Sequence, residues 1–181
     1  FIDWQKEWDA TGGVPLAATT GPSTIINLMY AYALTCGAEL NEAWGRIGIA
    51  EEYKIRSEAV KDKIRELCWD EDRNMYKEGP DTRQYTRHAQ AWAVLNELQD
   101  KETGRKILIN ALEGEDVIPC SFSASYEWFR ALEMAGMYEM TKDDMLRWKK
   151  LLDMGCTTCP ETPGISRSEC HAWSALPMYE M

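Results

Sequence analysis

The sequence lacks both a long apolar run and an excess of basic residues. Its longest apolar stretch, at 25–40, is interrupted by Asn27, Thr35 and Gly37, and so falls short of the roughly 18 residues that can cross a bilayer. The net charge is -10, from 20 Lys and Arg against 30 Asp and Glu, whereas phosphate binding needs clustered basic residues. We therefore expect neither a membrane nor a nucleic acid as partner, and neutral or polar substrates remain open.

Several catalytic motifs are also missing. The sequence contains no G-x-x-x-x-G-K phosphate loop, no G-x-S-x-G nucleophile elbow and no H-E-x-x-H zinc motif. Nucleotide, serine-hydrolase and metalloprotease functions lose their main support, and we expect no cofactor.

The length of 181 residues suits one domain, and a hydrophobic fraction of 45% is enough to fill a packed core. We expect residues 1–181 to form a single helical domain. The sequence begins with Phe1, with neither an initiator Met nor a signal segment, so we expect a piece of a longer protein. For its compartment we favour the periplasm or the cell exterior over the cytoplasm.

Two kinds of helix alternate along the chain. One kind is almost free of charge and predicts burial on nearly all sides, at 22–40, 87–98 and 122–137, with a further start at 171–178. The other kind is amphipathic, at 51–68, 102–112 and 141–154. In the first of these, Ile55, Ala59, Ile64 and Leu67 form the predicted apolar stripe.

This alternation predicts an all-α fold of inner and outer helices, as a double-layered helical barrel requires. The visible hairpins are fewer than a closed ring needs, so the chain would form only part of such a barrel. An open bundle or solenoid would show the same alternation with a fixed repeat length, and the sequence has no regular repeat.

The connections differ in length. Those that follow the apolar helices are short, whereas those that precede them are long, at 1–21, 70–86, 114–121 and 155–170. In an up-and-down arrangement the long loops would gather at one end, beside the N-termini of the inner helices. Long ordered loops on a rigid scaffold commonly carry binding and catalytic residues, so this end is the candidate active face.

The loop at 155–173 holds the densest cluster of reactive groups. Cys156 and Cys159 form a C-x-x-C pair that Cys170 and His171 could complete as a zinc site, but a second pair at the usual spacing is missing, and we predict no metal site. A thioredoxin-like redox pair needs a βαβ context that the sequence does not indicate. Disulfides among the six cysteines stay open.

A third interpretation of this loop centres on Glu161. Glycoside cleavage needs two carboxyl groups, one to protonate the leaving oxygen and one to activate water or attack the sugar. A lone loop glutamate is usually just solvated, but Glu161 has Pro160, His171 and Trp173 nearby on the candidate face.

The opening loop adds Asp3 and Trp4 at the same end. Trp4 and Trp8 suit a sugar subsite, although their spacing equally fits one face of a short buried helix. His88, in the first turn of an inner helix, could point into the same cavity or serve as a structural histidine.

The chain resembles the bacterial α-L-rhamnosidases over its whole length and in the family's order. The stretches that carry the resemblance are Phe1-Ile2-Asp3-Trp4, residues 86–95 around Thr86-Arg87-His88-Ala89-Gln90, Gly155-Cys156-Thr157-Thr158 followed by Glu161, and residues 166–177 beginning Ser166-Arg167-Ser168-Glu169-Cys170-His171-Ala172-Trp173. The last stretch is the most specific.

The resemblance implies an (α/α)6 six-hairpin glycosidase barrel, of which this chain is the C-terminal part. It implies hydrolysis of terminal α-L-rhamnose from glycosides or polysaccharides with inversion, with Glu161 as general base. It also implies that Trp4 and His171 contact the sugar, with Asp3, His88 and Trp173 as further substrate-binding candidates.

Two departures from the family pattern bear on activity. The family's general acid lies in an acidic motif that ends in Trp-x-Gly-Asp, which is missing here, so we expect this chain alone to be inactive. Pro160 stands where the family usually has an aromatic residue. Another barrel glycosidase of different sugar specificity, or a non-catalytic helical domain that binds carbohydrate or protein, stays open, as does self-association of the incomplete barrel.

Overall fold

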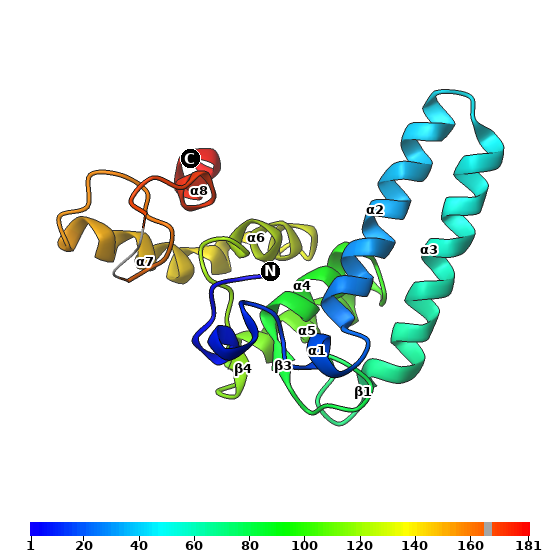
Figure 1. Ribbon diagram of the computed structural model, residues 1–181, viewed down its shortest axis with the longest axis horizontal. Helices are drawn as coiled ribbons and strands as arrows, with labels where there is room; N and C mark the ends of the chain where they lie inside the picture. The colour runs from blue at the N-terminus through cyan, green and yellow to red at the C-terminus, as the bar shows by residue number, and fades with distance from the viewer. Residues whose placement is uncertain (165–167) are drawn as a thin grey trace.

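The computed structural model describes residues 1–164 and 168–181, which are mainly helical (Figure 1). Ser166 and Arg167, which belong to the family-like stretch, lie outside the described residues. The main helices follow one another in pairs: α2 (Thr24–Ala43) with α3 (Ile47–Cys68), α4 (Arg87–Leu95) with α5 (Lys101–Glu113), and α6 (Ser125–Met134) with α7 (Thr141–Asp153). Shorter elements are η1 (Lys6–Thr11), α1 (Ala17–Thr20), η2 (Tyr138–Met140), η3 (Ala172–Ala175) and α8 (Leu176–Glu180).

Helix α4 is the central inner helix. It packs against α2, α5 and α6, and it occupies the middle of the molecule in Figure 1. Its alanines, Ala89, Ala91 and Ala93, are buried, and their small side chains allow neighbouring helices to approach closely. The predicted burial of this helix is confirmed.

Helix α2 does not meet the same prediction. Ile26, Met29 and Tyr30 are 44%, 39% and 43% exposed and, with Leu40, form an apolar stripe along the helix. The physical reason is its position: α2 packs mainly against α3 and α4 and lies at the edge of the helical array, so one of its sides stays uncovered (Figure 1).

The predicted apolar stripe of α3 is also wrong for most of its members. Ile64 is buried, but Ile55 and Leu67 are exposed. The face toward α2 instead carries small residues such as Ser57, whose hydroxyl donates to the backbone oxygen of Ala31 at 2.9 Å. Close packing of the two backbones has decided which side of α3 faces inward.

Short strands connect the long loops at one end of the helices. β1 (Trp69–Asp70) pairs antiparallel with β2 (Met75–Tyr76), while β3 (Tyr85–Thr86) pairs parallel with β4 (Val117–Ile118). The second pair joins the loop before α4 to the loop before α6. The predicted gathering of long loops is thus confirmed for these two, and the opening segment joins them through hydrogen bonds described below.

The largest apolar cluster lies among α4, α6 and α7, and includes Phe122, Trp128, Phe129, Leu132 and Trp148. Phe122 and Trp148 stack with ring centroids 4.4 Å apart. Among the described residues no helix is long and apolar enough to span a membrane.

Candidate active site

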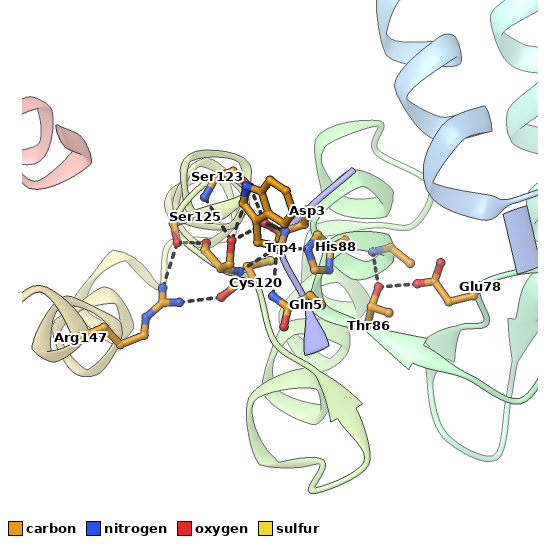
Figure 2. A network of polar contacts seen from close by, with 12 residues as sticks. Asp3, Trp4, Gln5, Glu78, Thr86, His88, Cys120, Ser123, Ser125 and Arg147 are labelled. Carbon is orange, nitrogen blue, oxygen red and sulfur yellow. Dashed lines mark hydrogen bonds and ion pairs between the residues drawn. The ribbon is translucent and has the colours of Figure 1, made fainter. Parts of the chain in front are cut away.

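Asp3 is the centre of a buried polar network that joins three loops (Figure 2). Its side chain is 0% exposed, and its two carboxylate oxygens accept hydrogen bonds from the opening segment, from α4 and from the loop before α6. The donors are the backbone N–H groups of Trp4 (2.8 Å) and Ser121 (2.7 Å), the side chains of Gln5 (3.0 Å) and His88 (2.6 Å), and the hydroxyls of Ser121 and Ser123.

This network keeps Asp3 ionised. Burial alone would raise the pKa of Asp3, but the hydrogen bond and charge of His88, together with the serine hydroxyls, hold that pKa well below its usual range. An ionised acceptor makes strong hydrogen bonds, so Asp3 fixes the positions of Trp4 and His88.

Gly13 determines how the opening segment reaches this point. Its carbonyl accepts the backbone N–H of Ile2 at 2.7 Å and of Asp3 at 3.2 Å. With φ +80° it occupies the left-handed region, and an added Cβ would lie 2.9 Å from the Asp3 carbonyl oxygen. Glycine is therefore required where the chain folds back over Asp3.

His88 is enclosed on the far side of the network. It is 2% exposed, donates through Nε2 to Asp3, and packs against the ring of Trp8 with centroids 4.9 Å apart. Just before it, Thr86 caps α4 by accepting the backbone N–H of Ala89 at 3.1 Å. The Thr86 hydroxyl donates to the carboxyl of Glu78. That carboxyl is buried, and burial raises its pKa to about 8.

A second group of side chains surrounds Glu161. The Glu161 side chain is 5% exposed, and its Oε1 lies 3.7 Å from Nε2 of His171. The indole N–H of Trp173 donates to the Glu161 carbonyl at 2.9 Å, and the rings of His171 and Trp173 lie 4.4 Å apart between centroids. The loop thus presents a carboxyl, an imidazole and an indole together.

The backbone around Glu161 is held from both sides. Its own N–H donates to the carbonyl of Ser168 at 2.9 Å. The Ser174 hydroxyl donates to the Pro160 carbonyl at 2.6 Å, and Trp148 of α7 donates its indole N–H to the Ser174 carbonyl at 2.7 Å. The loop is therefore tied to the apolar core.

The structure brings the predicted site residues together in two groups: Asp3, Trp4 and His88, and Glu161, His171 and Trp173. The six cysteines are free thiols, and no group of three or more His, Cys, Asp or Glu in the described ranges could hold a metal ion.

Three polar residues of this region were missed from sequence. Ser121 and Ser123 bind Asp3, and Glu127 lies in the first turn of α6, where burial raises its pKa and the charges of His88 and Asp3 act on that pKa in opposite directions. Ser121 ends the long loop predicted at 114–121 and Ser123 lies in the apolar segment predicted at 122–137, and no local pattern marked either serine as a partner of Asp3.

No family model and no curated protein sequence matches the chain. Among solved structures, a GH78 family rhamnosidase of Bacillus sp. GL1 superposes with a TM-score of 0.81 and 24% identity, covering 99% of this chain and 20% of that one. A rhamnosidase from Klebsiella oxytoca with rhamnose bound gives a TM-score of 0.80 and 23% identity, covering 100% of this chain and 36% of that one. The chain has the fold of part of these rhamnosidases.

This likeness is one of fold. It confirms the predicted all-α class and the predicted similarity to the rhamnosidase helical barrel. The chain spans only 20% and 36% of the length of the two rhamnosidases.

Proposed function

We propose that residues 1–181 form part of a glycoside hydrolase domain that removes terminal α-L-rhamnose from glycosides or polysaccharides with inversion. The observation that carries the proposal is the enclosed carboxyl of Glu161 beside His171 and Trp173, in a chain with the fold of rhamnosidases. A neighbour with rhamnose bound supports a sugar as ligand.

In this proposal Glu161 is the general base. It takes a proton from a water molecule, whose oxygen then attacks the anomeric carbon from the side opposite the glycosidic oxygen. The bond to that oxygen breaks, and a general acid from outside residues 1–181 protonates it. Inverting geometry places the two carboxyls roughly 6.5–9.5 Å apart, which leaves room for the water.

The neighbouring residues have distinct roles. Trp173 fixes the Glu161 backbone through its indole N–H, and His171 lies beside the carboxyl, where it can meet a sugar hydroxyl. The partly exposed indole of Trp4 offers an apolar face to the sugar ring. Because Asp3 and His88 are enclosed, we propose that Asp3 acts mainly by positioning these groups.

A substrate that needs no general acid tests Glu161 in this chain. Fluoride leaves an anomeric carbon without protonation, so α-L-rhamnosyl fluoride requires only activated water. We expect the 181-residue chain to release fluoride, and Glu161→Ala and Glu161→Gln to lower that rate by about 10²–10⁴-fold. The control is Glu102→Ala, because the Glu102 side chain is 80% exposed and pairs with Lys106.

The same assay separates the alternatives. Equal or faster release from other glycosyl fluorides would favour a glycosidase of different sugar specificity. No release from any of them, with sugar binding retained, would indicate a non-catalytic carbohydrate-binding domain. Undiminished release by both Glu161 variants would remove Glu161 as base.

A further inference from the structure

The first turns of two adjacent inner helices each carry an enclosed polar atom without a hydrogen-bond partner in the described ranges. These atoms are Nδ1 of His88 on α4 and Oε2 of Glu127 on α6. The two helices pack against each other, and both begin at the candidate face. His88 is buried, whereas Glu127 is partly exposed, so Glu127 is the member of the pair that lies nearer the surface of that face.

The chemistry of the two atoms is complementary to a hydroxyl group. The carboxylate of Asp3 can only accept, so His88 Nε2 carries a proton; Nδ1 then donates if the ring is charged and accepts if it is neutral. The ionised carboxylate of Glu127 accepts, and its protonated form donates. A hydroxyl has one proton to donate and lone pairs that accept, so it can bridge the two groups when either His88 Nδ1 or the Glu127 carboxyl holds a proton.

Glu127 lies in the first turn of α6, where the helix dipole favours a carboxylate, but it lacks an ion-pair partner among the described residues. In the described part of the chain no Lys or Arg forms an ion pair with its carboxyl, which distinguishes it from Glu133 on the same helix, paired with Arg130 at 2.7 Å. Burial raises the pKa of Glu127, although its own backbone N–H and His88 oppose this. An enclosed, unpaired polar group destabilises the fold, and such groups call for a functional explanation.

We propose that Glu127 is a further sugar-binding residue of the candidate face, and that with His88 it binds one ring hydroxyl of the sugar. This inference rests on the proposed function, and it adds a determinant of sugar specificity that lies on α6 rather than on the Glu161 loop. A site built to bind a hydroxyl discriminates against the sugar that lacks it, because its polar groups are then left unpaired.

The test combines Glu127→Leu and Glu127→Gln with titration of methyl α-L-rhamnoside, followed by tryptophan fluorescence of the 181-residue chain. We expect Glu127→Leu to raise Kd about tenfold or more, while its Tm stays equal to or above that of the unchanged chain. A carboxyl retained for structure would give the reverse, with a lower Tm and an unchanged Kd. Glu133→Leu and Glu133→Gln are the matched controls, with Kd expected within about two-fold.

Rhamnosides that lack one ring hydroxyl at a time identify the group that is bound. The unchanged chain should bind one particular deoxy sugar more weakly than the full rhamnoside. Glu127→Leu should bind these two sugars with nearly equal Kd, because it already lacks the interaction with that hydroxyl. Equal losses in both proteins for every deoxy sugar, or a Kd of Glu127→Leu within about two-fold of the unchanged chain, overturn this inference and leave the proposed function standing. An unchanged chain that binds no rhamnoside refutes both.

Discussion

Replacing Asp3 by Asn tests whether the buried carboxylate organises the candidate face. Asn has the same shape, but one of its two terminal atoms is a donor. With the amide nitrogen at the Oδ2 position, three donors would face it, from Gln5, His88 and Ser121. At the Oδ1 position it faces the Trp4 N–H and two serine hydroxyls, and only the hydroxyls can turn to accept.

The better orientation therefore still leaves one backbone N–H unpaired and removes the charge that strengthens every other hydrogen bond. An unsatisfied buried group costs about 1–3 kcal/mol, and breaking a buried charged pair about 3–5 kcal/mol. We expect Asp3→Asn to lower the free energy of unfolding by about 3–5 kcal/mol, out of roughly 5–15 kcal/mol for a domain. For a chain of this length the fall in Tm is about 6–20 °C.

Urea unfolding at pH 7, followed by far-UV circular dichroism, measures this difference. The pKa of Asp3 lies below its usual value of 3.8, so its stabilisation is complete above about pH 4 and is lost as the pH falls further. The difference between the two proteins should shrink only in that acidic range. The control is Asp116→Asn, since Asp116 pairs with Arg73 at 2.6 Å but is 61% exposed, and should cost at most about 1 kcal/mol. A loss for Asp3→Asn as small as that of the control would refute the reasoning.

Three further predictions concern other parts of the fold. Burial raises the pKa of Glu78 to about 8, so the folded chain holds a proton that the unfolded chain releases above about pH 4.5. The free energy of unfolding should therefore fall as the pH rises from about 4.5 to about 8. Glu78→Gln should remove that fall in urea unfolding at pH 5 and 8, and an unaltered pH dependence would contradict the assignment. Gly13→Ala should lower Tm and weaken rhamnoside binding, since its Cβ would collide with the Asp3 carbonyl; unchanged values for both would show that the turn is not required. The uncovered stripe on α2 predicts self-association, which Tyr30→Lys with Met29→Lys should reduce in sedimentation velocity, and a monomer at every concentration would count against it.

The sequence predicts inner and outer helices well where a helix has neighbours on all sides, as α4 does. It fails at α2, where apolar residues such as Ile26 and Met29 are exposed, because periodicity reports what a helix can bury and not which neighbours are present. It fails at α3 because the contact with α2 depends on small groups such as Ser57 rather than on the largest side chains.

In the candidate site, contacts between residues close in sequence could be predicted, whereas contacts between distant residues could not. His171 and Trp173 lie near Glu161 in sequence, and they lie near it in the structure. The contact between Asp3 and Ser121 joins residues that are 118 positions apart, and no local pattern predicts it. Glu127 was missed because the aromatic residues around it favoured a core helix, and its significance depends on the position of His88 on another helix.

The stereochemistry of the first product tests the central claim most directly. Proton NMR of α-L-rhamnosyl fluoride with the 181-residue chain should show β-L-rhamnose before mutarotation, and Glu161→Ala should form it only when azide is added, as the β-L-rhamnosyl azide, because azide attacks without needing a base. Initial release of α-L-rhamnose, or full activity of Glu161→Ala without azide, would contradict an inverting mechanism with Glu161 as general base.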